Sequence, residues 1–291
     1  MNHATHALKQ FKHQAFLARK RHRQAQERRA LRQQDHAGRA LEKAGHGPIY
    51  TPGRYSRTFV ERPEPPHQLG TPIPRVIHTV WFGDHMPQRR RHSLEALRAL
   101  NPGIPVTLIG ENNINDYILP EHPLHPAFWN LTSVHQSDYL RIYMMHFHGG
   151  GYSDLKNPYH PWGPMFDALQ SAPQCDVLGY REITSNYTSE NPRTLGEDLK
   201  KFYRFLIAPS AFIMRPYSLF TACTYRELLR RMDYCAPALT DSPVQDTYHL
   251  PHSYPVWWGE LMGDIIHCLS LRYPERVLFD DRIKPQLKDY R

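Results

Sequence analysis

The chain has 291 residues, enough for one large domain or two small ones, and 40% of them are hydrophobic, so a packed core is expected. No stretch approaches the roughly 20 consecutive apolar residues of a membrane span, and the amino terminus lacks the apolar segment of a signal peptide, which predicts a cytoplasmic protein. The four cysteines form no Cys-x-x-Cys pair and fit buried, reduced thiols better than a zinc site or a disulfide framework.

The net charge of +8 belongs to the amino-terminal segment. Residues 1–46 hold 11 Lys and Arg against 3 acidic residues, whereas the rest of the chain carries 25 of each kind. Residues 5–44 lack proline and are rich in good helix formers, so we expect a basic helical extension over residues 1–46. Such a helix packs on the body, or lies against an acidic polymer or the inner face of a membrane. It carries no motif that reads a nucleic-acid groove, so no specific nucleic acid is expected.

A proline-rich linker is expected over residues 47–72, followed by one α/β domain over residues 73–291. The early body elements are predicted from their apolar patterns and breakers as a strand at 75–83, a helix at 88–100, a strand at 106–109, a helix at 133–148 and an extended segment from 152. Ser133 or Ser137 would cap the helix at 133–148, and three glycines would end it.

The second half of the chain continues the same alternation of strands and helices. The predicted elements are strands at 176–179 and 206–214 and helices at 218–233 and 257–270. This order predicts a mostly parallel sheet flanked by helices. In such sheets the ligand lies at the carboxyl ends of the strands, where the strand order reverses.

Two charged residues inside an apolar helix are the first candidates for a site. Asp138 and Arg141 are three residues apart and therefore share one helix face, among Leu140, Ile142 and Tyr143. Buried charges need a partner, so an Asp–Arg pair without a further role is one interpretation and a ligand site is the other.

Two sequence blocks resemble a known family. The first block, residues 73–83, reads IPRVIHTVWFG, and the second, residues 137–156, reads SDYLRIYMMHFHGGGYSDLK. They resemble the patterns IPxxIHxxWFG and SDxxRxxxLxxxGGxYxDxD of glycosyltransferases that carry a DxD-type sugar-binding motif, which include capsular polysaccharide synthesis proteins and yeast-type mannosyltransferases. The second block matches at Ser137, Asp138, Arg141, Gly149, Gly150, Tyr152 and Asp154.

The resemblance implies a GT-A fold, which is a Rossmann-like sheet. It implies transfer of a sugar from a UDP- or GDP-sugar to a carbohydrate acceptor, with retention of configuration, in the synthesis of a capsular or other surface polysaccharide. The donor contacts that it implies are His78 and Trp81 near the base or ribose, Asp138 and Arg141 at the sugar and ribose hydroxyls, the turn Gly150, Gly151 and Tyr152, and Asp154 as the first acid of the metal motif. Ordinary core packing is the alternative for His78 and Trp81.

Lys156 departs from the family pattern, which has a second acid at this position. One interpretation is that its ammonium group neutralises the donor diphosphate without a metal. A second is that Mn²⁺ or Mg²⁺ still binds through Asp154 and a later residue such as His267 or Asp264. A third is that the protein is inactive and only binds a nucleotide-sugar or a polysaccharide. The aromatic pair Trp257 and Trp258 suits an acceptor sugar but also a protein core.

Overall fold

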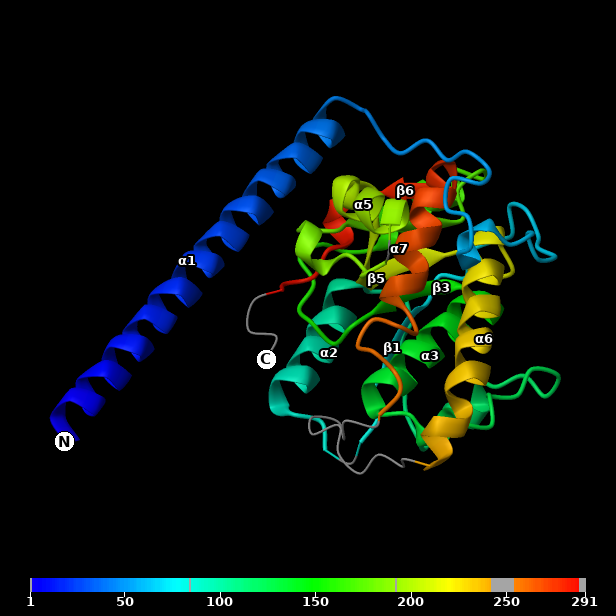
Figure 1. Cartoon of the computed structure of the whole chain (residues 1–291). Coiled ribbons are helices and arrows are strands. Elements are labelled where there is room, and N and C mark those ends of the chain that lie inside the picture. The colour runs from blue at the N-terminus through cyan, green and yellow to red at the C-terminus, as the bar shows by residue number, and fades with distance from the viewer. Residues whose placement is uncertain (1, 84, 192, 242–253, 288–291) are drawn as a thin grey trace.

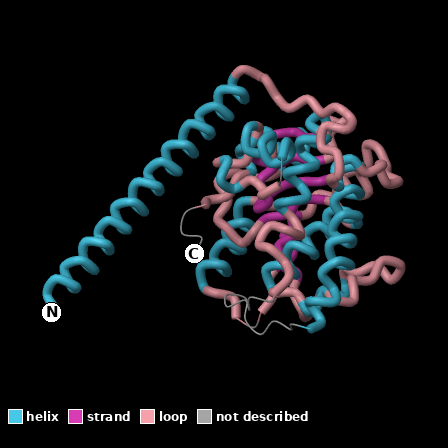
Figure 2. Tube along the Cα trace, viewed as in Figure 1, coloured by secondary structure: helices cyan, strands magenta, loops and turns pink. Residues whose placement is uncertain are grey.

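The computed structural model describes residues 2–83, 85–191, 193–241 and 254–287. Figure 1 shows a body built on one sheet, with a long amino-terminal helix extending from it, and Figure 2 shows the helices and loops that surround the strands. The strands are β1 (Ile77–Val80), β2 (Val106–Ile109), β3 (Gly150–Ser153), β4 (Val177–Arg181), β5 (Ile207–Met214) and β6 (Val277–Phe279).

Seven α-helices lie within the described ranges. They are α1 (Asn2–Lys43), α2 (Gln88–Leu100), α3 (Ser133–Phe147), α4 (Gly163–Gln170), α5 (Arg193–Lys201), α6 (Leu219–Asp241) and α7 (Gly263–Arg272). Short 3₁₀ helices complete the described structure: η1 (Phe59–Glu61), η2 (Ile114–Asp116), η3 (Phe128–Asn130), η4 (Ser185–Tyr187), η5 (Tyr203–Phe205), η6 (Pro274–Arg276) and η7 (Asp281–Ile283).

The sheet has the order β2-β1-β3-β5-β4-β6. β1 pairs in parallel with β2 and β3, and β4 pairs in parallel with β6. β5 is antiparallel to both of its neighbours, so β3 and β4 run in the same direction. The sheet is therefore mixed but mostly parallel, as expected. All the described strands except β5 end at the same edge.

Alternating side chains direct the two faces of the sheet into separate cores. Val80 and Tyr152 pack in the larger core, which holds residues of α3, α6 and α7. Ile77 packs on the opposite face with Leu97 of α2 and Phe166 of α4. The sheet is thus a central layer between helices.

Local sequence explains how α3 begins and ends. Thr132 is the amino-terminal cap, because its side chain accepts a hydrogen bond from the backbone N–H of His135, at 3.2 Å from N to Oγ1. The prediction of Ser133 or Ser137 as the cap was wrong. The helix ends as predicted, because Gly149 (φ +65°) and Gly150 (φ +88°) adopt a conformation that favours glycine.

The other predicted boundaries differ from the structure in two helices. α7 begins at Gly263 rather than at Trp257, because residues 257–262 form turns. α6 continues beyond the predicted end at Asp233, with Pro237 inside it. All four cysteines are buried and unpaired, as expected.

The linker residues pack closely on the body. Apart from η1, residues 47–72 form no helix or strand, as their prolines predict. Tyr55 and Val60 are nevertheless buried in a third core, against Leu199 of α5 and Leu271 of α7. Within the described part of the chain, no helix is both long and apolar enough to cross a bilayer.

Candidate functional site

The strand order reverses beside β1, which has β2 on one side and β3 on the other. This reversal is the topological switch point at which open α/β sheets bind their ligands. Trp81 directly follows β1, and Asp154 directly follows β3. Since these parallel strands end at the same edge, Trp81 and Asp154 both lie at the carboxyl edge beside the switch point.

A network of opposite charges lies at this edge. Arg141 lies 3.0 Å from Asp138, measured from Nη2 to Oδ1, and 3.5 Å from Asp154, measured from Nη1 to Oδ1. Lys156 Nζ lies 3.1 Å from Asp154 Oδ2. The Tyr152 hydroxyl donates to Asp154 Oδ1 at 3.0 Å. Two carboxylates and two cations therefore balance within one buried cluster, which we call the switch-point network (Asp138, Arg141, Tyr152, Asp154 and Lys156).

Contacts from two strands fix the position of Arg141. Its guanidinium donates to the carbonyl oxygen of Pro209 at 2.9 Å, at the amino end of β5. It also lies over the ring of Tyr152, with 4.5 Å between Cζ and the ring centroid. The Tyr152 ring in turn stacks on Phe212 of β5. Arg141 is therefore held in a fixed geometry, which suits recognition of a group that carries several oxygens.

The two carboxylates of the network differ in their pKa. Burial raises the pKa of Asp138 to about 6, although Arg141 acts to lower it. Burial also acts to raise the pKa of Asp154, but Lys156 and Arg141 outweigh this effect and hold it below its ordinary value. Burial raises the pKa of Tyr152 far above its ordinary value, so its hydroxyl stays neutral and donates to Asp154. Asp154 is thus the permanent anion and Asp138 the titrating one.

The raised pKa of Asp138 predicts a pH dependence of stability. Between pH ~4 and ~6 Asp138 binds more protons in the folded state than in the unfolded state, so its contribution to the free energy of unfolding falls by about 2–3 kcal/mol as the pH rises through this interval. Asp154 contributes in the opposite direction only at lower pH, whereas His78 and His146, whose pKa burial lowers to about 4, contribute in the opposite direction within the same interval. The quantity to measure is therefore the difference in the free energy of unfolding between the wild type and Asp138→Asn, which should fall by this amount between pH ~4 and ~6 in chemical denaturation. The exposed control Asp116→Asn should differ from the wild type by a constant amount, and a constant difference for Asp138→Asn would contradict the assignment.

The network does not fit a divalent metal ion. Such an ion requires several oxygen ligands. Both carboxylate oxygens of Asp154 are already engaged, and the ammonium group of Lys156 adjoins one of them. No group of three or more His, Cys, Asp or Glu side chains gathers as a metal site among the described residues. Among the described residues, Asp154 is thus paired with two cations, Arg141 and Lys156.

His267, the second predicted metal ligand, has other partners. Its Nδ1 accepts from the backbone N–H of Ser189 at 3.3 Å. Its Nε2 lies 3.6 Å from Oε2 of Glu182, and both side chains are buried. The structure thus pairs His267 with an acid that follows β4 rather than with Asp154. Sequence reasoning missed Glu182, because the predicted strand ended at residue 179 whereas β4 ends at Arg181, directly before this acid.

His78 and Trp81 differ in their position relative to the carboxyl edge of the sheet. The Nδ1 atom of His78 lies 2.9 Å from the hydroxyl of Thr107, and burial lowers the pKa of His78 to about 4, so it is neutral near pH 7. His78 lies inside β1 rather than after it, which favours ordinary core packing, although its Nε2 atom is also buried without a hydrogen-bond partner among the described residues. Trp81 has a buried indole N–H that finds no acceptor among the described residues. Such an unsatisfied donor at a switch point favours a ligand contact.

The glycines of the second block have a packing role. A Cβ atom on Gly150 would lie 2.8 Å from the carbonyl oxygen of Val76, and one on Gly151 would lie 2.7 Å from the ring of Trp162. Both glycines lie at the amino end of β3, whereas Asp154 follows its carboxyl end. The absence of their side chains is therefore explained by close packing inside the sheet rather than by a bound group.

The tryptophan pair lies on the surface. Trp257 is 80% exposed and Trp258 is 68% exposed, so the alternative that they form part of the core was wrong. The turn that carries them is held by His135 of α3, whose Nε2 lies 3.0 Å from the carbonyl oxygen of Trp257. The hydroxyl of Tyr254 lies 2.7 Å from Nδ1 of the same histidine. Two exposed aromatic faces are thus tied to the first turn of α3, three residues before Asp138.

No protein-family model and no curated protein matches this chain. The resemblance to DxD-type glycosyltransferases therefore rests on the two sequence blocks.

Proposed function

We propose that the protein is a glycosyltransferase that moves a sugar from a UDP- or GDP-sugar to a carbohydrate acceptor. The observation that carries the proposal is the switch-point network, in which Lys156 occupies the place of the second acid and pairs with Asp154 at 3.1 Å. A nucleotide diphosphate leaves as an anion, and fixed cations at the carboxyl edge of a sheet stabilise such a leaving group. The resemblance of the two sequence blocks supports the same function and, with it, a GT-A fold.

The chain's own residues have distinct tasks in this proposal. Arg141 and Lys156 neutralise charge on the departing diphosphate, and Asp154 positions both of them. Asp138 accepts hydrogen bonds from hydroxyl groups of the donor. Trp81 contacts the nucleotide through its indole N–H. No protein base is required in a retaining reaction, because the leaving diphosphate takes the acceptor proton, and the protein's main contribution is to hold the two substrates together.

The exposed faces of Trp257 and Trp258 supply the acceptor contact in this proposal. Aromatic faces of this kind pack well against the apolar faces of sugar rings. The contact between His135 and the Trp257 carbonyl places their turn beside α3, which also carries Asp138 and Arg141. The acceptor would then reach the donor from the side of the first turn of α3.

A thermal-shift panel of UDP- and GDP-sugars tests donor binding. A donor at about 100 times its dissociation constant should raise the melting temperature by about 5–10 °C, with or without manganese. Release of UDP or GDP in the presence of an acceptor would then establish transfer. If no nucleotide-sugar raised the melting temperature and none was consumed, the proposal would fail.

A non-catalytic protein that binds a nucleotide-sugar or a polysaccharide is the second candidate. The internal pairing of Asp154 with both cations favours it, because these charges are already balanced without a substrate. The same panel separates the two candidates. A thermal shift without turnover for any acceptor supports the binding protein, whereas turnover excludes it.

A further inference from the structure

The switch-point network is attached to the sheet near the amino end of β5. The carbonyl oxygen of Pro209 accepts a hydrogen bond from the Arg141 guanidinium at 2.9 Å. The next carbonyl oxygen, that of Ser210, accepts from the backbone N–H of Asp154 at 2.8 Å. Two consecutive carbonyl groups of β5 therefore hold a cation and a carboxylate of the network. A shift of the chain at residues 209 and 210 would displace both side chains.

The helix α1 contacts the segment that leads into β5. This segment is η5, which ends at Phe205, two residues before β5 begins. The Tyr203 hydroxyl donates to the carbonyl oxygen of Asp35 at 3.0 Å. The Tyr203 ring packs so closely on Gly38 that a Cβ atom there would overlap it. Because Tyr203 is fully buried, η5 cannot shift without opening this contact.

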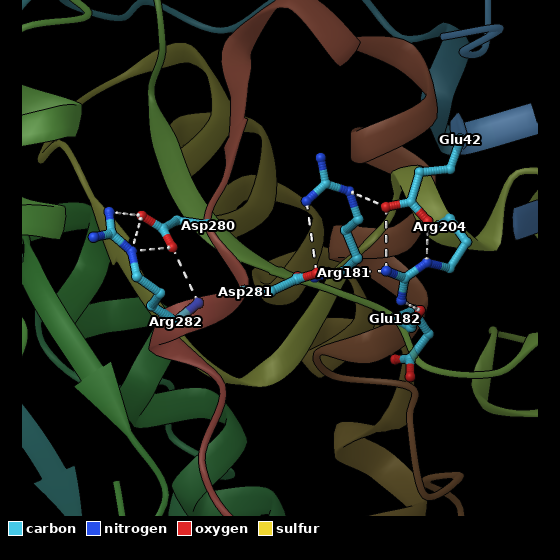
Figure 3. Close-up of polar contacts among 7 residues, drawn as sticks. All are labelled: Glu42, Arg181, Glu182, Arg204, Asp280, Asp281 and Arg282. Carbon is cyan, nitrogen blue, oxygen red and sulfur yellow. Dashed lines mark hydrogen bonds and ion pairs between the residues drawn. The ribbon is translucent and has the colours of Figure 1, made fainter. Parts of the chain in front are cut away.

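A charged cluster holds the next residue of η5. Arg204 Nε lies 2.6 Å from Oε2 of Glu42, and Arg204 Nη2 lies 3.2 Å from Oε1, so the two groups form a two-point ion pair. Arg204 Nη1 donates to the carbonyl oxygen of Glu182 at 2.9 Å, and Arg204 Nη2 lies 3.4 Å from Asp281. Figure 3 shows these contacts around the arginine. One side chain thus joins α1 to the residues that follow β4 and β6.

The helix α1 also holds the loop that follows β4. The Asp35 carboxylate accepts hydrogen bonds from the Thr184 hydroxyl at 2.9 Å and from both the backbone N–H and the hydroxyl of Ser185 at 2.8 Å. In the same loop, the backbone N–H of Glu182 donates to the carbonyl oxygen of Leu206 at 2.9 Å. This loop and the chain before β5 are therefore paired with each other, and α1 contacts both of them.

The contact residues of α1 form a short segment of the helix. Asp35, Gly38 and Glu42 are spaced by three and four residues, which places them on one helix face. By contrast, every side chain from residue 21 to residue 30 is exposed, and Figure 1 shows that this part of the helix diverges from the body. The helix therefore has an attachment segment, residues 35–42, and a projecting segment, residues 16–34.

We propose that the attachment segment of α1 positions Arg141 and Asp154 for donor binding. It acts through η5 and the first residues of β5, so Asp35, Glu42 and Arg204 are positioning residues that do not touch the donor. The inference rests on the proposed function, in which Arg141 binds the donor diphosphate. A guanidinium group that is already held in place loses less conformational freedom on binding, which favours affinity.

Hydrogen exchange in the full chain tests the positioning without a donor. The backbone N–H of Asp154 should exchange at least about 10-fold faster in the double variant Asp35→Asn, Glu42→Gln than in the wild type, when measured by NMR well below the melting temperature. Arg62→Gln is the matched control, because it breaks another partly buried ion pair, with Glu227 of α6. It should leave the exchange rate of Asp154 unchanged.

Nucleotide affinity provides the second measurement. The double variant should bind UDP or GDP at least about 10-fold more weakly than the wild type and should bind the corresponding nucleoside equally well, because the nucleoside has no diphosphate to contact Arg141. Arg204→Lys keeps the charge but loses the two-point contact, so its affinity should be intermediate. The variant Arg23→Gln, Glu27→Gln removes an ion pair of the projecting segment and should bind as the wild type does.

Three outcomes would overturn the proposal. One is an Asp154 exchange rate in the double variant that equals the wild-type rate, and another is an equal increase in Arg62→Gln. The third is an equal loss of nucleoside and diphosphate affinity, which would indicate general damage rather than displacement of Arg141. If the wild type bound neither UDP nor GDP, the proposed function would fail, and the exchange rates would still decide whether α1 positions Asp154.

Discussion

Replacing Lys156 by aspartate should make donor binding depend on a divalent metal ion. In the wild type the ammonium group lies 3.1 Å from Asp154 and supplies positive charge at the edge, so chelation with EDTA should leave donor binding and turnover unchanged. Lys156→Asp removes this charge and places a second carboxylate two residues after Asp154. We expect activity in EDTA to fall about 100-fold and manganese to restore part of it, because two neighbouring carboxylates can bind the ion.

Lys156→Met is the matched control for this experiment. It removes the charge without adding a ligand, so its activity should fall by a similar factor and manganese should restore none of it. If the wild type itself lost donor binding in EDTA, the metal-free role of Lys156 would be wrong, although the proposed sugar transfer would stand. If neither the wild type nor either Lys156 variant bound a donor, the proposed function would fail instead.

Gly150→Ala should strongly destabilise the fold. Gly150 has a φ of +88°, and an added Cβ would lie 2.8 Å from the carbonyl oxygen of Val76 in a neighbouring segment. The left-handed conformation costs about 1–2 kcal/mol for a residue with a side chain, and crowding against backbone adds about 1–3 kcal/mol. We therefore expect the free energy of unfolding to fall by about 3 kcal/mol and the melting temperature by about 6–12 °C.

Gly263→Ala provides the comparison for this change. An added Cβ at Gly263 has no heavy atom within 4 Å, and the residue begins the helix α7. Its melting temperature should stay within about 2 °C of the wild type. A Gly150→Ala protein that kept its stability but lost donor binding would contradict the packing role. It would indicate instead that Gly150 contacts the donor.

The apolar pattern of the sequence predicted most of the scaffold. The helix 88–100 and the strand 106–109 have the predicted bounds, because each is a short apolar pattern ended by a strong breaker. Asp138 and Arg141 are paired as their spacing suggests. These features depend on residues that are close together in the sequence, so one sequence is enough to predict them.

Features that depend on distant segments escaped prediction. The partner of His267 is Glu182, which is 85 residues away, and no local pattern links them. Asp35 and Glu42 of α1 have partners that are even farther away in the sequence, in η4, β4 and η5. The direction of β5 was also not foreseen, since the apolar run at 206–214 fits a strand of either direction.

The position of β5 has a consequence for folding and for truncated forms. β1, β2 and β3 all come from residues 77–153, but the outer neighbour of β3 is β5, which begins at residue 207. Until β5 pairs with it, β3 exposes a row of unpaired backbone N–H and C=O groups. Strands of other chains can pair with these groups, which leads to aggregation. Fragments that end before residue 207 would keep this open edge, and they would also lack the Pro209 carbonyl that holds Arg141. Folding of the sheet is therefore a late, long-range event, which is intrinsically slow.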